Sequence, residues 1–321
     1  MLSAFVREFG GPRQVIALAE RPRPDPGPGE VEVRIGRAAV NPSDLIPVTG
    51  AYRSRTVLPF VPGFEGVGIV SRTGRGVTGL REGDRVLPIG AGGLWQEYLV
   101  RPEQWCFRVP GGLSDDEAAT SYVNPLTAFR LVAALGEHFG ASRGHSVGVT
   151  AAASAIGRML LRLLAQDGFT PVAIVRSEET KARLAAGFPG DITVCDGAAA
   201  ASLKLDAVLD AVGGDTGNAL FSRVLSPGGA FVQYGALSGH QLDPSLVASR
   251  SDVRFSFLWL RQWVHSAPRE EIEAAFERSF DGIRAGHLAS AVDGTFALAD
   301  LAAALARQED PARQGKVLIA P

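Results

Sequence analysis

The second half of the chain alternates short apolar runs with stretches of helical character, and this alternation limits the possible folds more than any other feature. Six such runs occupy residues 146–150, 171–175, 191–195, 206–210, 229–234 and 253–258. Each run has the length of a strand buried on both faces, and the chain between neighbouring runs is long enough for a helix. Regular alternation of strands and helices predicts a doubly wound parallel sheet.

The first third of the chain has a different pattern. Residues 30–36 alternate polar and apolar side chains after the Pro- and Gly-rich run 22–29, and residues 65–73 and 82–89 repeat this alternation. Alternation of polar and apolar side chains with a period of two, in segments bounded by turn residues, is typical of half-buried strands. The helical segments that a parallel sheet requires between its strands are missing here. We therefore expect a β-rich, barrel-like domain in this part.

The change from one pattern to the other lies near Ser114. This residue and Glu117 match the capping box that starts a helix. Beyond the α/β part, the sequence predicts an amphipathic helix at 268–282, a short helix within 296–307 and a strand at 315–319 that returns to the first domain. The predicted domains are residues 1–121 (β-rich), 122–281 (α/β) and 282–321 (the return to the β-rich domain).

Length and charge exclude several classes of protein. The chain of 321 residues is about twice the common domain size, which favours two domains. A formal net charge of −2 provides no attraction to nucleic acid or to an anionic membrane. The longest uncharged stretch, 224–242, is broken by Pro and Gly, and Glu8 interrupts any secretory signal. We therefore expect a soluble protein without nucleic-acid or membrane partners. Cys106 and Cys195 have no metal-binding spacing, which fits a reducing cytoplasm.

The turn after the first α/β strand has the composition of an anion-binding turn. It reads Thr150-Ala151-Ala152-Ala153-Ser154-Ala155-Ile156-Gly157. Small side chains allow backbone amides and the positive end of a helix to approach a pyrophosphate. Only Gly157 stands in the usual G-x-G-x-x-G pattern, so a tightly packed turn without a ligand is the alternative.

The end of the second α/β strand bears on the choice of cofactor. NAD enzymes carry an acidic residue there for the ribose 2′-hydroxyl, whereas this chain has Arg176 followed by Ser177. A guanidinium and a hydroxyl both donate to a 2′-phosphate, so this pair favours NADPH over NADH. Two alternatives stay open: Arg176 is an ordinary solvated charge, or Glu178 weakens the phosphate site.

No metal site is predicted. Two-domain dehydrogenases that use zinc need Cys or His near the first helix, with His or Glu beside it. The corresponding stretches, residues 40–44 and 63–65, contain no Cys or His. The histidines are dispersed along the chain, so each is interpreted as a core or surface residue. The expected chemistry is a hydride transfer without a metal.

Several motifs carry a resemblance to a known family. They are Asn41-Pro42-Ser43-Asp44 with Gly50-Ala51-Tyr52, Pro62-Gly63-Phe64-Glu65-Gly66, Val123-Asn124-Pro125-Leu126-Thr127-Ala128-Phe129, Gln233-Tyr234-Gly235 and Leu258-Trp259-Leu260-Arg261-Gln262-Trp263. On these motifs the chain resembles the medium-chain dehydrogenase/reductase superfamily over essentially its whole length. Within it, the chain is similar to the zinc-free mitochondrial-type trans-2-enoyl-thioester reductases first and to quinone oxidoreductases next. The resemblance implies a Rossmann domain, a doubly wound parallel sheet, inserted into a GroES-like β-rich catalytic domain.

The resemblance also implies site residues. It makes Tyr52 the catalytic tyrosine, and a phenol, being protonated at neutral pH, is suited to hydrogen-bond or protonate an enolate. The alternative is a loop tyrosine that packs on apolar neighbours. For Lys316, which the resemblance assigns to the cofactor, the alternative is an ordinary charge at a strand edge. The cofactor-binding residues implied are Asn124, Ala153, Ser154, Ala155, Ile156, Arg176, Ser177, Tyr234, Gly235, Ala236, Leu237, Leu258, Trp259, Leu260 and Lys316.

The implied activity is NADPH-dependent transfer of a hydride to the β-carbon of an activated C=C bond, above all in a trans-2-enoyl thioester. A quinone or enone oxidoreductase is one alternative. An NADPH-binding protein with little catalysis is another, because a fold does not fix a function. The glycine-poor turn and Arg53, where the family usually has Gly, favour this last alternative. The family also implies a homodimer, formed through the strand at residues 254–258.

Overall fold

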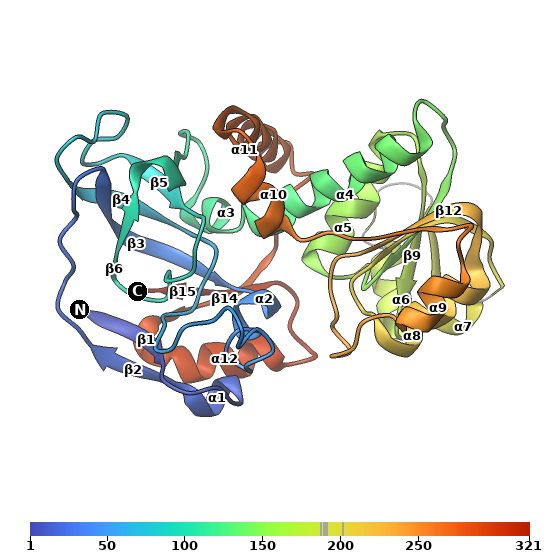
Figure 1. Ribbon diagram of the computed structural model, residues 1–321, viewed down its shortest axis with the longest axis horizontal. Helices are drawn as coiled ribbons and strands as arrows, with labels where there is room; N and C mark the ends of the chain where they lie inside the picture. The colour runs from blue at the N-terminus through green and yellow to red at the C-terminus, as the bar shows by residue number, and fades with distance from the viewer. Residues whose placement is uncertain (187, 189–191, 201) are drawn as a thin grey trace. The chain divides into compact units, whose positions relative to one another are not determined.

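The structure, a computed structural model, describes residues 1–186, 188, 192–200 and 202–321. It divides into two compact units (Figure 1). Unit 1 comprises residues 1–123 and 264–321, and unit 2 comprises residues 124–263. The chain therefore leaves unit 1 once and returns to it, as an inserted domain requires.

Unit 1 is built on a seven-stranded sheet to which both ends of its chain contribute. The strand order is β14-β15-β3-β4-β5-β7, and β6 also pairs with β3. Strand β15 from the end of the chain runs antiparallel to β3, so residues near both ends of the chain share this sheet. A separate two-stranded sheet joins β1 and β2. The strands are β1 (Leu2–Val6), β2 (Ile16–Glu20), β3 (Glu30–Val40), β4 (Gly66–Thr73), β5 (Arg85–Pro88), β6 (Tyr98–Pro102), β7 (Cys106–Arg108), β14 (Val292–Ala297) and β15 (Lys316–Ala320).

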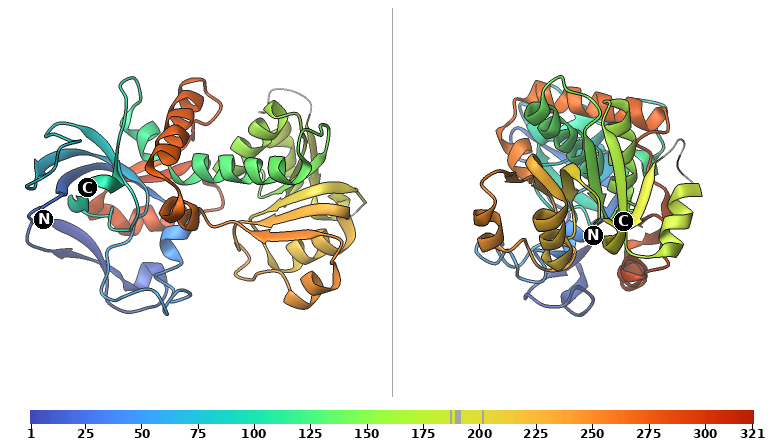
Figure 2. Two further views of the ribbon diagram at one scale, coloured as in Figure 1. Left: turned by 45° about the horizontal axis from the view of Figure 1, so that its top comes forward. Right: turned by 90° about the vertical axis from the view of Figure 1, so that its right-hand side faces the viewer.

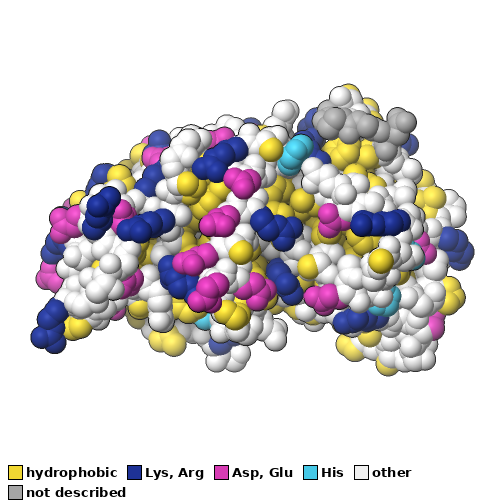
Figure 3. All heavy atoms as spheres, turned by 90° about the horizontal axis from the view of Figure 1, so that it is seen from above, with side chains coloured by type: hydrophobic (Ala, Val, Ile, Leu, Met, Phe, Trp, Pro, Cys, Tyr) yellow, Lys and Arg dark blue, Asp and Glu magenta, His cyan; other side chains and the backbone are white. Residues whose placement is uncertain are grey.

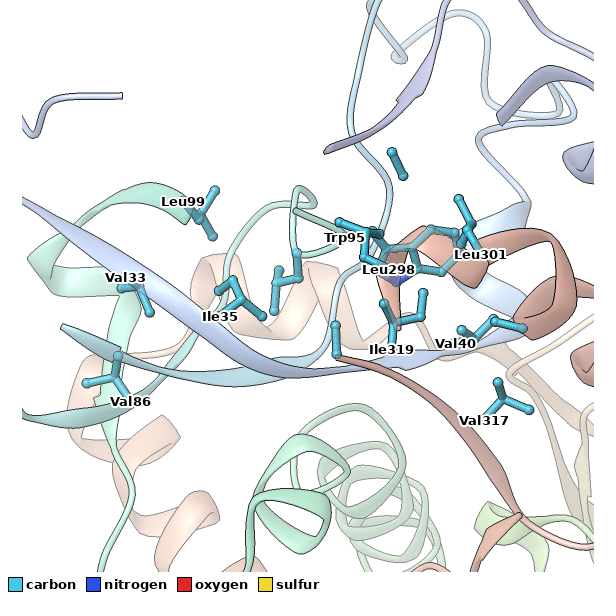
Figure 4. Close-up of a cluster of buried hydrophobic side chains, with 14 of the residues drawn as sticks. Val33, Ile35, Val40, Val86, Trp95, Leu99, Leu298, Leu301, Val317 and Ile319 are labelled. Atoms are coloured by element: carbon cyan, nitrogen blue, oxygen red, sulfur yellow. The ribbon is translucent and has the colours of Figure 1, made fainter. Parts of the chain in front are cut away.

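The core of unit 1 follows from the period-two pattern of its strands. Figure 4 shows Val33 and Ile35 of β3 in one apolar cluster with Ile319 of β15. Trp95 is fully buried in this cluster, and its indole N–H donates to the carbonyl of Ala39 at 3.1 Å. The buried tryptophan thus keeps a hydrogen bond while it fills the core.

The helices of unit 1 begin where the sequence places a cap or a proline. Ser114 accepts from the N–H of Glu117 at 3.2 Å, and the Glu117 carboxylate accepts from the N–H of Ser114 at 2.8 Å. The predicted capping box is therefore confirmed. Residues 296 and 297, expected in a helix, end strand β14 instead. The helices are α1 (Pro12–Val15), α2 (Pro42–Leu45), η1 (Glu103–Trp105), α3 (Asp115–Ala119), α11 (Arg269–Arg284), η3 (Leu298–Asp300) and α12 (Leu301–Glu309).

The second boundary of the inserted unit lies earlier in the chain than the sequence suggests. The expected α/β domain ends at residue 281, whereas unit 2 ends at residue 263. Helix α11 belongs to unit 1 because Phe276 packs on Phe107 and Tyr122, with ring centroids 5.1 and 5.8 Å apart. An amphipathic helix is compatible with either domain, so its pattern alone does not assign it.

Unit 2 is a six-stranded sheet with the order β10-β9-β8-β11-β12-β13. Every neighbouring pair is parallel. This is the doubly wound sheet that the alternation predicts, with strands at all six expected places. Residue 191, which opens one predicted strand, lies outside the described residues. The strands are β8 (Ser146–Thr150), β9 (Thr170–Val175), β10 (Thr193–Asp196), β11 (Leu205–Asp210), β12 (Leu225–Gln233) and β13 (Arg254–Phe257).

Helices cover both faces of this sheet, as the right-hand view of Figure 2 shows. Burial on both faces explains why its strands are continuous apolar runs rather than alternating ones. Strand β13 is at one edge of the sheet. The helices are α4 (Val123–Phe139), α5 (Ala155–Gln166), α6 (Glu178–Ala186), α7 (Gly197–Ala200), α8 (Gly214–Ala219), the π-helix η2 (Leu220–Val224), α9 (Pro244–Ser249) and α10 (Leu260–Ser266).

The surface carries charges of both signs. On the face shown in Figure 3, basic and acidic side chains are interspersed, in keeping with a formal net charge of −2. Within the described ranges, no helix has the length and apolar character needed to cross a membrane.

Candidate functional site

The carboxyl edge of the parallel sheet has its switch point between β8 and β11. The chain runs outward from β8 through β9 to β10, then returns to β11 on the other side of β8. Open α/β sheets bind ligands at such a point, outside the carboxyl ends of the strands. Here β8 ends at Thr150 and β11 at Asp210, and the Thr150 hydroxyl donates to the Asp210 carboxylate at 2.8 Å.

The turn from β8 into α5 has the geometry of an anion-binding turn. Ala151 has a φ of +50°, and no other non-glycine residue among those described has a positive φ. Ser154 caps α5, because its hydroxyl accepts from the N–H of Gly157 at 3.1 Å. A Cβ atom at Gly157 would come within 2.6 Å of the carbonyl oxygens of Ala151 and Ala152. The backbone is therefore tightly folded in front of the positive end of a helix of 12 residues, which fits a pyrophosphate.

Arg176 and Ser177 follow β9 at the same edge, and both side chains are exposed. The Ser177 hydroxyl donates to the hydroxyl of Thr180 at 3.0 Å, which holds it at the start of α6. Glu178 is 3.4 Å from the ammonium of Lys181, so its charge is partly compensated. The guanidinium of Arg176 has no carboxylate within ion-pair distance among the described residues. Arg176 follows the end of the second strand, which is where dinucleotide-binding sheets of this type carry the residue that contacts the ribose.

The segment after β12 adds a buried hydroxyl to this edge. Tyr234 Oη is buried and has no hydrogen-bond partner among the described residues. Burial raises the pKa of Tyr234, and the nearby Asp210 raises it further. Gly235 accepts from the Gln233 side chain at 3.1 Å, whereas Ala236 and Leu237 are exposed. A buried hydroxyl without a partner next to an exposed apolar segment is suited to a ligand at this edge.

The other predicted cofactor residues of unit 2 lie on two segments. Asn124 is in the first turn of α4. Leu258 directly follows β13, and its N–H donates to the carbonyl of Gln233 at 2.9 Å. Trp259 is half-buried, and Leu260 is buried at the start of α10. The structure thus brings residues 153–156, 176–177, 234–237 and 258 to one edge of the sheet.

Unit 1 contains a buried polar cluster that we call the α2 cluster: Asn41, Asp44, Glu65 and Lys316. Asn41 donates through its side chain to Glu65 at 2.9 Å and through its backbone N–H to Asp44 at 2.6 Å. Lys316 Nζ donates to the side-chain oxygen of Asn41 and lies 3.8 Å from Glu65 Oε2. Strand β15 lies between β14 and β3, so the alternative of a strand-edge charge for Lys316 is wrong.

Burial perturbs the ionisation of this cluster. It raises the pKa of Asp44 to about 7, although two backbone N–H groups, from Asn41 and Phe64, oppose the shift. It lowers the pKa of Lys316, against the attraction of Glu65 and Asp44. The carboxylate of Glu65 also accepts from the N–H groups of Tyr122 and Val123, at 3.0 and 2.7 Å. Every carboxylate oxygen in the cluster therefore has a donor.

Tyr52 belongs to the turns that follow α2. Its side chain is half-buried, and the guanidinium of Arg55 lies over its ring, 4.0 Å from the centroid. Arg53 in the same turns lies over the ring of Phe9 at 5.6 Å, and Gly50 has a φ of +81°. Tyr52 and Lys316 belong to unit 1, whereas the other predicted site residues belong to unit 2.

Sequence reasoning missed the Thr150–Asp210 pair and, except for Lys316, the members of the α2 cluster. The Thr150–Asp210 pair and the α2 cluster both come from charged or polar residues that end or interrupt apolar runs. Such residues are a usable signal, because a buried charge requires a partner. The partners themselves are up to 275 positions apart in the sequence, and only the fold joins them.

Comparisons with known proteins agree with this architecture. The alcohol dehydrogenase GroES-like domain family matches residues 27–111, and the zinc-binding dehydrogenase family matches residues 190–319. A mitochondrial enoyl-[acyl-carrier-protein] reductase of Xenopus tropicalis is 30% identical over 319 residues, which cover 94% of this chain and 90% of that protein.

Two solved structures share the whole fold. A Bacillus thuringiensis protein, provisionally assigned as an NADPH:quinone reductase, has a TM-score of 0.88 and 30% identity, covering 100% of this chain and 98% of that one. A mycobacterial protein in complex with NADPH has a TM-score of 0.85 and 28% identity, with 100% of both chains covered.

A doubly wound α/β domain inserted into a GroES-like domain is the architecture of a two-domain dehydrogenase or reductase. The chain belongs to the medium-chain dehydrogenase/reductase superfamily and is an oxidoreductase of that type. The predicted fold class and the predicted resemblance are both confirmed.

The residues present do not fit the zinc ion that the name of the second family suggests. Both oxygens of Asp44 accept backbone N–H groups, and Phe64 offers no ligand atom. Glu65 is occupied by Asn41 and two backbone amides, and the ammonium of Lys316 beside it repels a cation. Across the described part of the chain, no three His, Cys, Asp or Glu side chains are grouped as metal ligands.

Proposed function

We propose that the protein is an NADPH-dependent reductase that transfers a hydride to the β-carbon of an activated C=C bond, with a trans-2-enoyl thioester as substrate. The observation that carries this proposal is the anion-binding turn at the switch point, with a guanidinium in place of a carboxylate after the next strand. The similarity to enoyl-[acyl-carrier-protein] reductases, at 30% identity for the Xenopus protein, supports the substrate class.

Unit 2 supplies the residues that hold the dinucleotide. In the proposal, backbone amides of the turn at Ala153, Ser154, Ala155 and Ile156 bind the pyrophosphate, because they lie at the positive end of α5. Arg176 and Ser177 donate to the 2′-phosphate. The nicotinamide half contacts Asn124, Tyr234, Gly235, Ala236, Leu237, Leu258, Trp259 and Leu260. Lys316, which the resemblance also assigns to the cofactor, is already held by Asn41.

Tyr52 supplies the proton chemistry in this proposal. Bound NADPH provides the hydride, and negative charge then develops on the thioester oxygen of the substrate. The phenol of Tyr52 donates to that oxygen or delivers the proton to the α-carbon. The guanidinium of Arg55 over the Tyr52 ring adds positive charge close to the tyrosine. This charge favours an anionic enolate next to the Tyr52 hydroxyl.

A second candidate function is reduction of a quinone or a small enone by the same hydride. The B. thuringiensis structure, with a TM-score of 0.88, favours it through the provisional assignment of that protein as a quinone reductase. A third candidate, from another class, is NADPH binding with little catalysis, which the single glycine of the turn favours.

We also propose a homodimer in a reducing compartment such as the cytoplasm. Strand β13 at the edge of its sheet leaves backbone groups that a second copy would pair. Cys106 and Cys195 are both buried free thiols, which suits a reducing environment.

One experiment separates the three functions. Steady-state oxidation of NADPH is measured with crotonyl-CoA, with a longer enoyl-CoA and with a quinone. The proposal requires a kcat/KM with an enoyl thioester at least tenfold above that with the quinone. Preference for the quinone supports the second candidate, and NADPH binding without turnover of any substrate supports the third.

A further inference from the structure

The α2 cluster places a buried cation where the sequence of a zinc dehydrogenase would place metal ligands. Residues 40–44 and 63–65 are the stretches that correspond to such ligands, and Asn41, Asp44 and Glu65 in them are buried. The cation is the ammonium of Lys316, which is 6% exposed and comes from the last strand of the chain. The cluster therefore contains a fixed ammonium cation. Its carboxylate oxygens all accept hydrogen bonds already, so none is free to bind a metal.

Lys316 is connected to α2 through a single residue. Its Nζ donates to the side-chain oxygen of Asn41, whose backbone N–H donates to the carboxylate of Asp44 at 2.6 Å. The other oxygen of Asp44 accepts from the N–H of Phe64 at 2.8 Å. Asn41 is the N-cap of α2, so Lys316 holds the residue from which this short helix starts.

The α2 helix leads directly into the turns that carry Tyr52. The helix ends at Leu45, and Val48 and Thr49 donate backbone N–H groups to the carbonyl of Leu45 at 3.0 and 3.2 Å. A helix of 4 residues has little stability of its own. The orientation of the turns therefore depends on contacts from outside α2. These are the α2 cluster at the start of the helix and, after the helix, the hydrogen bond from the N–H of Gly10 to the carbonyl of Val48 at 3.0 Å.

Removal of the ammonium would leave the cluster unbalanced. Asp44 and Glu65 are 0% and 1% exposed, and Lys316 is the basic side chain that lies within ion-pair distance of Glu65. Buried carboxylates without a counter-charge take up a proton or rearrange. Either response changes the hydrogen bonds at Asn41 and hence the start of α2.

We propose that Lys316 is a positioning residue: through Asn41 it fixes α2 and thereby the orientation of Tyr52, in place of a metal centre. The proposal rests on the function proposed above only for its catalytic consequence. The mechanical part, a strand at the end of the chain that orders residues 46–55, stands independently of any substrate.

The catalytic part is tested by a double-mutant cycle with Lys316→Met and Tyr52→Phe, measured as kcat with crotonyl-CoA and Kd for NADPH. We expect Lys316→Met to lower kcat at least tenfold and to change Kd less than threefold. In the Tyr52→Phe background the same change should lower kcat less than threefold, because no hydroxyl remains to be positioned. Equal losses of kcat in both backgrounds, or a tenfold rise in Kd with kcat unchanged, would overturn the proposal.

Two further variants keep the test valid if Lys316→Met does not fold. Asn41→Ala removes the connection to α2 but leaves Lys316 beside Glu65, and it should reproduce the loss of kcat and its dependence on Tyr52. Lys316→Arg keeps the charge and should retain more activity than Lys316→Met. The matched control is Lys204→Met, an exposed lysine of unit 2, which should leave kcat and Kd unchanged.

Amide hydrogen exchange tests the mechanical part without any turnover. Lys316→Met and Asn41→Ala should each speed exchange within residues 46–55 at least tenfold relative to Lys204→Met. Unchanged exchange in this segment would overturn the proposal even if kcat falls. A wild-type protein inactive on every enoyl thioester would contradict the proposed function, while faster exchange would still support the positioning role.

Discussion

Thr150 and Asp210 are joined by a 2.8 Å hydrogen bond between the two central strands of the parallel sheet. The same Thr150 hydroxyl accepts from the N–H of Ala211 at 2.8 Å, and Asp210 accepts from the N–H groups of Val212 and Gly213. Burial raises the pKa of Asp210, and these hydrogen bonds oppose the shift. The pair fixes the carboxyl ends of β8 and β11 relative to each other, at the edge where we propose that the cofactor binds.

The first prediction concerns this pair. Thr150→Val removes the hydroxyl and leaves a buried carboxylate and a backbone N–H each short of one partner, which costs about 1 to 3 kcal/mol of stability. Urea unfolding at neutral pH measures the effect. Thr150→Ser keeps the hydroxyl and serves as the control, with a smaller loss. A Val variant as stable as the wild type would show that the hydrogen bond contributes nothing.

The second prediction concerns cofactor preference. We expect NADPH to bind at least tenfold more tightly than NADH, because a charge-assisted contact contributes about 1.5 to 3 kcal/mol and about 1.4 kcal/mol corresponds to tenfold. Arg176→Ala should erase most of this preference and leave the Kd for NADH nearly unchanged in a fluorescence titration.

A matched control for this titration is Arg223→Ala, an exposed arginine of η2 that precedes the amino end of β12, the opposite edge of the sheet. It should leave both affinities unchanged. If Arg176→Ala weakens NADPH and NADH equally, Arg176 has a structural role and does not select the 2′-phosphate.

The sheet of unit 2 could be predicted from the sequence because its strands are apolar throughout. A strand that is buried on both faces of the sheet is apolar at every position, so its ends are visible in the sequence. The apolar run at residues 146–150 therefore predicts β8 with its observed bounds. Strand β14 was missed because its side chains are mostly exposed or half-buried and give no strong apolar pattern. Helix α11 was predicted as a helix, but its packing partner, Phe107, lies more than 150 positions away and cannot be read from a local pattern.

The candidate site shows the same division. Ala153, Ser154 and Arg176 follow strands whose carboxyl ends a parallel sheet must bring to one edge, so their grouping was predictable. The contact between Lys316 and Asn41 was not, because it depends on the pairing of β15 with β3, between strands at opposite ends of the chain. A local motif can identify Lys316 as a charged residue of interest. Which residue it contacts depends on how β15 aligns with β3, and a local motif does not contain that information.

The third prediction concerns zinc. We expect less than a tenth of an equivalent of zinc after incubation with excess zinc and removal of free metal, because the oxygens of the α2 cluster already accept hydrogen bonds and Lys316 repels a cation. Elemental analysis measures the content. One equivalent of zinc per chain, lost in Glu65→Gln, would contradict the structure of the cluster.

The fourth prediction concerns assembly. Light scattering at micromolar concentration should give the mass of a dimer, and Phe257→Asp on the edge strand β13 should give a monomer, because it places a charge where two edges would pair. Phe257 is 48% exposed in the single chain. Val57→Asp, at an exposed apolar residue of unit 1, should leave the dimer intact. A monomeric wild type would contradict pairing through this edge.

The turnover number of Tyr52→Phe with an enoyl thioester tests the proposed function most directly. Loss of the hydroxyl should lower kcat by about 10²-fold or more, because one contact made in the transition state disappears. The aromatic ring stays, and with it the stacking of Arg55 at 4.0 Å, so stability and the Kd for NADPH should not change. We therefore expect kcat alone to fall. Unchanged turnover together with unchanged stability would remove Tyr52 from the mechanism and contradict the proposed function.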